Sequence, residues 1–292
     1  MMKTALSIIQ SVCRRINHPV PTTLLSLTDP DELQLLELLY AVCEELRQAR
    51  CWVQLKRKHA FTTVNGQASY QLPADFYAAL MPRWNTAEDL RLIGPVSDDD
   101  FGAKLYGSDP SSFNFTLRLF GRDENTASAS GQVELSPTPS SAVACAFEYI
   151  TRSYLLPQNW AASTSYGANA YVNASGNIYQ KGAGTATSGA TVPSHTSGSV
   201  SDGTIAWTYI STPYETVLAD TDLVVFDDDL VKLGLEAYIA ERRGGDYEAL
   251  RGEFQAKIDQ AVGRYRGPYL GSFCAPKDQR AYTVTPLKGW SL

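Results

Sequence analysis

The sequence predicts an α+β fold in which helices from both ends of the chain form a bundle and a β region lies between them. Amphipathic patterns with helical spacing occur twice near the N-terminus and twice near the C-terminus. Between them the apolar residues alternate over short runs, as they do in half-buried strands. Residues 158–212 differ in composition from their surroundings, which predicts a small all-β inserted domain.

Two N-terminal helices follow from their apolar spacing and their end signals. The apolar positions of the first are Leu6, Ile9, Val12 or Cys13, and Ile16. Pro19 ends this helix, whereas Asp29 can cap a second one that has Pro30 at its first position. The apolar seam of the second helix is Leu35, Leu39, Val42, Leu46, Ala49 and Val53. Arg47 and other polar residues are expected around this seam, which should pack on other helices.

The β region is predicted from alternation and turn residues. The Asn65-Gly66 pair between runs 59–64 and 69–72 predicts a hairpin, because this pair supplies the positive φ angles of a tight turn. Further strands are expected at 79–84, 90–93, 113–120, 132–135 and 143–154. Residues 97–100 should open a short helix.

Two C-terminal helices complete the predicted bundle. The aspartates at 227–229 can cap the first, which should end at Gly244 and Gly245, and Asp246 can cap the second. The apolar stripe of the second is Tyr247, Leu250, Phe254, Ile258, Ala261 and Tyr265. Residues 1–157 and 213–265 are therefore expected to form one discontinuous domain.

Residues 158–212 form the predicted insert. Their only charged side chains are Lys181 and Asp202, and small polar residues dominate. The recurring aromatics are Trp160, Tyr166, Tyr171, Tyr179, Trp207 and Tyr209. Flexible linkers lack such rings, whereas a small β module needs them for a core. Trp160, Tyr166, Tyr179 and Trp207 are also candidate glycan-binding residues, because exposed rings stack on sugars.

Composition excludes several classes of protein. The 292 residues carry 25 Lys and Arg against 31 Asp and Glu, a net charge of −6, which argues against general nucleic-acid binding. Five scattered cysteines without a CxxC pair predict reduced, buried thiols in a cytoplasmic context rather than a zinc or disulfide framework. No apolar run is long enough to span a membrane, so no membrane partner is expected.

No metal, cofactor or catalytic site is predicted. His18, His59 and His195 lie far apart in the sequence, and the aspartates at 98–100 and 227–229 are favourable at helix starts without a cation. Phosphate-binding and nucleophile-elbow motifs are missing. A carboxylate pair for glycoside cleavage stays open at this point, because only the separation in space identifies one.

The last segment is basic and apolar. Residues 266–292 are expected to form an extended C-terminal arm, since prolines and glycines interrupt any helix. From Arg264 onward there are five basic residues and one acidic residue. An arm of this kind can bind a partner or wrap over its own subunit, and the sequence favours neither.

Several motifs together resemble the head-to-tail adaptor, or tail accessory, proteins of tailed bacteriophages, particularly short-tailed ones. The segments that carry the resemblance are Trp52-Val53-Gln54-Leu55, Tyr70-Gln71-Leu72-Pro73-Ala74-Asp75-Phe76, Val133-Glu134-Leu135-Ser136-Pro137, Phe147-Glu148-Tyr149-Ile150 and Gly245-Asp246-Tyr247. The resemblance as a whole covers most of residues 1–157 and 213–265. The insert is similar to small β modules of phage structural proteins related to carbohydrate-binding modules.

The resemblance implies a structural virion protein at the head-tail junction with no catalytic residue. It implies a homo-oligomeric ring, a dodecamer, under the portal protein, which extends the DNA channel, docks the nozzle or tail-tube protein and serves genome ejection. DNA would pass without specific binding. The arm residues then expected to bind the portal are Arg264, Arg266, Tyr269, Phe273, Lys277, Arg280, Tyr282 and Trp290.

Two alternatives accompany this hypothesis. The first is a peptidoglycan-active, muramidase-like virion protein, because some adaptors of this kind are muramidases. The second is a glycan-binding decoration that acts through the insert on an inert ring.

Overall fold

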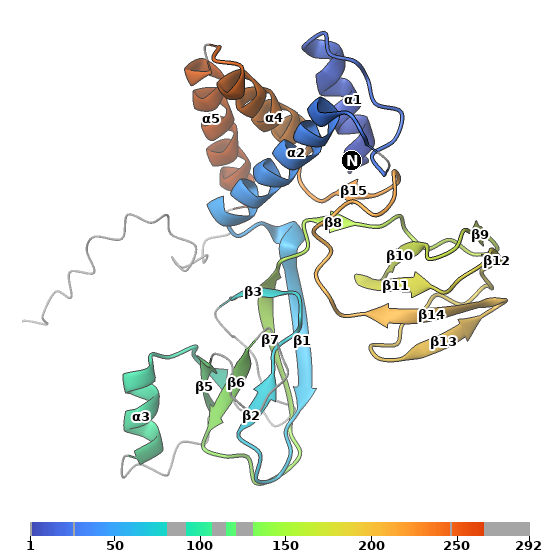
Figure 1. The fold of residues 1–292 in the computed structure, drawn as a ribbon. Coiled ribbons are helices and arrows are strands. Elements are labelled where there is room, and N and C mark those ends of the chain that lie inside the picture. The colour runs from blue at the N-terminus through green and yellow to red at the C-terminus, as the bar shows by residue number, and fades with distance from the viewer. Residues whose placement is uncertain are drawn as a thin grey trace, which may run out of the picture.

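The chain is an α+β protein, as predicted. The computed structural model describes residues 2–25, 27–80, 92–106, 115–120, 131–245 and 247–265. Within these residues helices alternate with several small sheets. Figure 1 shows the N-terminal and C-terminal helices gathered at one end, strands β1 (Lys56–Thr62) and β7 (Ala144–Thr151) running away from them, and the strands of the insert to one side.

Four helices share one hydrophobic core. They are α1 (Ala5–Arg15), α2 (Pro30–Ala49), α4 (Asp228–Arg242) and α5 (Glu248–Tyr265). Helix α4 contacts each of the other three. Their inward side chains include Ile8, Leu39, Val231 and Phe254, all buried in one cluster. Helices from the two ends of the chain therefore bury their apolar faces together.

The predicted helix starts are confirmed at two aspartates. Asp29 accepts the backbone N–H of Asp31 at 2.9 Å at the start of α2. Asp227 accepts the N–H of Asp229 at 3.1 Å at the start of α4. Each cap satisfies an amide that the helix itself leaves without a partner. Asp246, the predicted cap of α5, lies outside the described residues.

The predicted apolar stripes of α2 and α5 are confirmed except at one end of each. Leu35, Leu39, Val42 and Leu46 are buried, but Val53 is 46% exposed and lies beyond α2 in a 3-10 turn, η1 (Val53–Leu55). In α5, Phe254 and Ile258 are buried whereas Tyr247 is exposed. The stripe positions at Val53 and Tyr247 are therefore wrong, because each lies outside its helix and faces solvent.

Helices α2, α4 and α5 meet most closely at Gly234. A Cβ atom at this position would lie 2.8 Å from ring atoms of Phe254 and 2.8 Å from Cγ1 of Val42. Real Cβ contacts are not this short, so only glycine allows this approach. The crossing of the three helices depends on a missing side chain.

We expect Gly234→Ala to lower the free energy of unfolding by about 1–3 kcal/mol, because the methyl group overpacks the core. Urea denaturation followed by circular dichroism measures the change. Gly252→Ala in α5 is the matched control, since its added Cβ meets no atom within 4 Å. Alanine there should be neutral or stabilise by up to about 1 kcal/mol. Equal effects at both sites would contradict the packing argument.

The β region consists of two sheets with one core between them. The first has the order β1-β7-β3, with β1 (Lys56–Thr62), β7 (Ala144–Thr151) and β3 (Phe76–Ala79). The second has the order β2-β6-β5-β4, with β2 (Ser69–Gln71), β6 (Gln132–Ser136), β5 (Phe115–Phe120) and β4 (Leu92–Ile93). Buried residues of both sheets, such as Leu117 and Phe147, belong to the same cluster. The two sheets therefore pack on each other.

The predicted hairpin around Asn65-Gly66 is wrong. Strand β1 pairs along its whole length with β7, and β2 pairs with β6 in the other sheet. Gly66 still has a φ of +79°, so the turn needs its glycine. The Tyr70 hydroxyl accepts the N–H of Val64 at 2.8 Å, which fixes the connection as a crossing between sheets. Tertiary pairing with distant strands overrides the local turn signal.

The other strand predictions are confirmed where they can be compared. Runs 113–120, 132–135 and 143–154 contain β5, β6 and β7, while runs 79–84 and 90–93 lie partly outside the described residues. The predicted short helix is α3 (Asp98–Tyr106), and Ser97 Oγ accepts the N–H of Asp100 at 3.2 Å. The guanidinium of Arg118 on β5 lies 4.6 Å from the Phe101 ring centroid. Helix α3 is therefore anchored on the second sheet.

Residues 158–212 form strands with their own core. The strands are β9 (Ser165–Tyr166), β10 (Tyr171–Ala174), β11 (Asn177–Lys181), β12 (Ala186–Thr187), β13 (Ser199–Asp202) and β14 (Ile205–Ile210). The main sheet has the order β10-β11-β14-β13, and β12 pairs with β9. Ile178 belongs to the helical core cluster, and the rings of Tyr171 and Tyr214 lie 5.6 Å apart. The insert is thus packed against the rest of the chain.

The chain leaves for the insert and returns from it at one place. Strand β8 (Leu155–Leu156) pairs antiparallel with β15 (Leu223–Val224). Tyr214 donates its N–H to Ser153 Oγ at 2.9 Å, and its carbonyl accepts the N–H of Leu155 at 3.3 Å. The two connections are therefore held side by side.

Candidate functional site

The candidate portal-binding residues lie almost entirely outside the described residues. Arg264 is in the last turn of α5, and the structure describes its backbone but not its side chain. The residues outside the description are Arg266, Tyr269, Phe273, Lys277, Arg280, Tyr282 and Trp290. The described residues reach Tyr265 at the C-terminal end of α5, and portal binding by the residues that follow stays a prediction.

The four candidate glycan-binding rings differ in exposure. Tyr166, Tyr179 and Trp207 are buried in the core of the insert, and the rings of Tyr166 and Trp207 lie 5.3 Å apart edge to face. The Tyr179 hydroxyl donates to the carbonyl of His195 at 2.8 Å. Trp160 is half-buried against the same cluster. Stacking on a sugar needs an exposed ring face, so only Trp160 offers part of one here.

Arg47 is a buried cation at the centre of an ionic network whose other members are partly exposed. It lies on α2 and is 6% exposed. Its guanidinium donates to Glu215 at 2.6 Å, to Glu44 at 2.5 Å and to the carbonyl of Arg152 at 3.0 Å. Arg152 precedes the insert and Glu215 follows it. One side chain therefore ties helix α2 to both connections of the insert.

The prediction that Arg47 is one of the polar residues around the apolar seam of the helix is wrong, because its side chain is buried. Its guanidinium lies 4.6 Å from the ring centroid of Tyr77 and 5.7 Å from that of Tyr154. The aromatic rings and carboxylates compensate for the lost hydration of the cation. The helical spacing alone could not reveal that Arg47 is buried, because its partners Arg152 and Glu215 are far away in the sequence.

We expect Arg47→Met to lower the free energy of unfolding by about 3 kcal/mol, because it removes the shared partner of Glu44 and Glu215. The control is Arg50→Met at the C-cap of the same helix, because the ion pair of Arg50 with Asp259 at 3.2 Å is more exposed. That change should cost at most about 1 kcal/mol. Thermal and urea denaturation of both variants test the comparison, and equal losses would argue against a central role for Arg47.

Asp222 organises the segment that returns from the insert. Its side chain is fully buried and accepts from the Tyr214 hydroxyl at 2.9 Å and from the N–H groups of Leu218 and Ala219 at 2.7 and 2.9 Å. Its carbonyl accepts the N–H of Ala5 at 2.8 Å, at the start of α1. Burial raises the pKa of this carboxyl group, although the three hydrogen bonds oppose the rise. Because solvent cannot reach it, Asp222 is unsuited to act as an acid on a polysaccharide.

The raised pKa of Asp222 predicts a pH dependence. The native state holds this proton more tightly than the unfolded state, so the carboxyl contributes less stability as pH rises above its ordinary value of 3.8. The unfolding free energy of the wild type minus that of Asp222→Asn should therefore decrease as pH increases from that value toward neutrality. Urea titrations at several pH values measure this difference. A difference that grows with pH would contradict the assignment.

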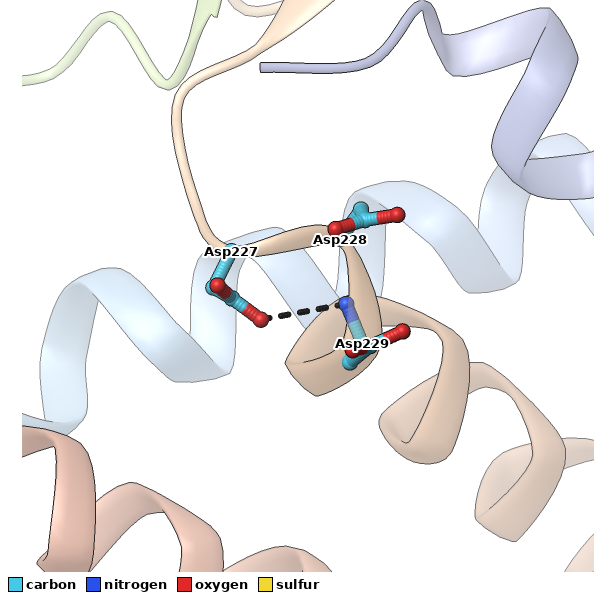
Figure 2. A group of neighbouring side chains, drawn as sticks. All are labelled: Asp227, Asp228 and Asp229. Carbon is cyan, nitrogen blue, oxygen red and sulfur yellow. Dashed lines mark hydrogen bonds between the residues drawn. The ribbon is translucent and has the colours of Figure 1, made fainter. Parts of the chain in front are cut away.

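The aspartates at 227–229 are the group whose carboxylates lie close enough to hold a cation among the described residues. Their ligand atoms are within 4.8 Å of one another. Figure 2 shows that Asp227 instead points at the N–H of Asp229, as a helix cap does. Lys232 Nζ lies 2.8 Å from Asp228 Oδ2 and lowers the pKa of that carboxyl group. Capping and the lysine pair account for this acidic group.

His59 lies among aromatic side chains of the β region. His59 packs between Phe61 and Phe147, with ring centroids 5.7 and 5.3 Å away, and burial lowers its pKa while Asp75 opposes this. Packing of this kind explains the histidine without a metal.

The prediction of reduced thiols is confirmed for three of the described cysteines and fails for one. Cys13, Cys43 and Cys145 are free and buried, and burial raises the pKa of Cys145 to about 11. Cys51 is disulfide-bonded, so the prediction of reduced thiols is wrong for this residue. It is half-buried just beyond the end of α2. Cys274 lies outside the described residues.

These features define a structural building block: a helical core, a projecting β region and an inserted sheet joined by Arg47 and Asp222. Residues 3–183 match the family model described as SU10 adaptor protein, and since this is more than half of the chain, the protein belongs to that family. It is a phage adaptor with a structural role and a component of the virion. A comparison with curated proteins gave no match.

The family match has clear limits within the fold. It includes α1, α2, the β region and the insert as far as β11, and it ends before α4 and α5. No helix in the described parts of the chain has the length and apolar character needed to cross a membrane.

Proposed function

We propose that this adaptor forms a ring, a dodecamer, under the portal of the phage head, extends the DNA channel there and docks the next tail component. The observation that carries the proposal is the membership of the SU10 adaptor family over residues 3–183. A subunit whose side faces bind each other head to tail closes into a ring when the rotation between neighbours is suitable. The helical bundle would be the platform of this ring.

The arrangement of the helices and sheets supports a division of the chain into parts with separate roles. Helices α1, α2, α4 and α5 share a core at one end, and the two β sheets project from it (Figure 1). In our proposal residues 1–157 and 213–265 are the ring-forming domain, 158–212 are an inserted module and 266–292 are an arm. The ladder of β8 and β15 and the contacts of Tyr214 support a boundary beside these connections.

The charge of the chain suits a conduit for DNA. The whole chain is acidic, with a net charge of −6. An acidic wall repels phosphate, so DNA would slide without binding. The basic residues beyond Arg264 are an exception, and we assign them to contact with the portal protein.

We expect deletion of residues 268–292 to abolish portal binding, because it removes most of the basic and aromatic residues of the arm. Co-sedimentation of the variant with portal rings of the same phage measures this. Circular dichroism and oligomer size provide the control, since the four helices end before the deletion. Full portal binding by the folded truncation would contradict the role of the arm.

A further inference from the structure

One flank of helix α2 and the loops beside it present apolar side chains that are exposed or half-buried in the described chain. Leu33 is 44% exposed, and Leu36 and Tyr40 are half-buried on the same side at spacings of three and seven residues. Leu25 is 55% exposed and Leu218 is 44% exposed on neighbouring loops. We call these five residues the α2 flank.

Hydrogen bonds place the two loops beside the helix. The Tyr40 hydroxyl accepts the N–H of Val217 at 3.0 Å, so Leu218 follows directly next to α2. Asp220 Oδ1 accepts the N–H of Leu24 at 2.7 Å, which joins the loop carrying Leu25 to the loop carrying Leu218. The apolar residues of the α2 flank therefore come from three adjacent segments.

The segments around the α2 flank are acidic. Residues 20–46 contain no Lys or Arg, and Asp29, Asp31, Glu32 and Glu37 belong to the cap and the first half of α2. Asp29 and Glu37 are exposed on α2 and its cap, and Asp220 is half-buried on the facing loop. A ligand of this surface would therefore combine apolar side chains with positive charge.

Residues 266–292 of the same chain have this combination. They contain four basic residues and one acidic residue. Their large apolar residues are Tyr269, Leu270, Phe273, Tyr282, Val284, Leu287 and Trp290. The segment starts at the end of α5, and the ion pair of Arg50 with Asp259 at 3.2 Å places this end of α5 beside the C-terminal end of α2.

Residues 266–292 are long enough to reach the α2 flank from the end of α5. Helix α2 has 20 residues, so its two ends are about 30 Å apart at 1.5 Å per residue. An extended segment of 27 residues spans up to about 90 Å. Because the segment is tethered nearby, its effective concentration at the flank is high.

We propose that residues 266–292 dock on the α2 flank of their own subunit, with apolar side chains on Leu33 and Leu218 and basic side chains on the acidic rim. This contact is separate from binding to the portal, and it covers the apolar surface of the subunit before another partner is present. Displacement from the flank would free the arm.

Photo-crosslinking of the full chain tests the proposal. The crosslinking amino acid p-benzoylphenylalanine replaces Tyr282 in one protein and Trp290 in another, and mass spectrometry identifies the attached peptides. We expect crosslinks from at least one of these positions to the α2 flank. Leu33→Asp and Leu218→Asp should each lower their yield by about tenfold, because a buried carboxylate removes an apolar anchor. Sodium chloride at 0.5 M should also lower it, since salt screens the charge attraction.

The controls separate docking from misfolding and from exchange between subunits. Val200→Asp changes a residue that is 49% exposed on β13 of the insert, and it should leave the yield unchanged. Circular dichroism verifies the fold of every variant. Mixtures of ¹⁵N-labelled and unlabelled chains should give crosslinks only within one chain. Mixed crosslinks, crosslinks elsewhere, no crosslinks, or insensitivity to both leucine changes would overturn the proposal.

Discussion

The packing of helix α4 against α1, α2 and α5 is the constraint on which the rest of the structure depends. Helix α4 follows the β region and the insert in the sequence, yet it completes the core to which α1 and α2 contribute. Its contact with α2 and α5 is so close at Gly234 that no side chain fits. The two ends of the described chain are thus mutually dependent, and neither pair of helices can bury its apolar face alone.

Polar groups then determine how the insert and the β region connect to this core. Arg47 reaches both connections from the side of α2, and Asp222 fastens the returning segment to the start of α1. Buried charges cost hydration, and they are tolerated because each has several partners. Apolar packing supplies the bulk of the stability, while these two residues select one arrangement of the connections.

The sequence predicted the elements well and their partners poorly. Caps at Asp29 and Asp227 depend on residues within one helical turn, and both were predictable. The hairpin at Asn65-Gly66 was not, because β1 gains a full ladder with β7, which lies some eighty residues further along the chain. The roles of Arg47 and Asp222 were missed for the same reason: their partners come from distant segments. In the insert, composition identified the rings, but only the fold separated buried Trp207 from half-buried Trp160.

The ladder between β8 and β15 has an evolutionary consequence. Leu155 and Val224 are paired neighbours, so their backbones are separated by the usual spacing of adjacent strands, about 5 Å. A different module can take the place of residues 158–212 only if its two ends meet at a similar distance and it restores the contacts that Ile178 makes with the helical core and Tyr171 makes with Tyr214. The packing of residues 158–212 on the helical core, and not only the spacing of their two ends, therefore limits which sequences this part of the chain accepts.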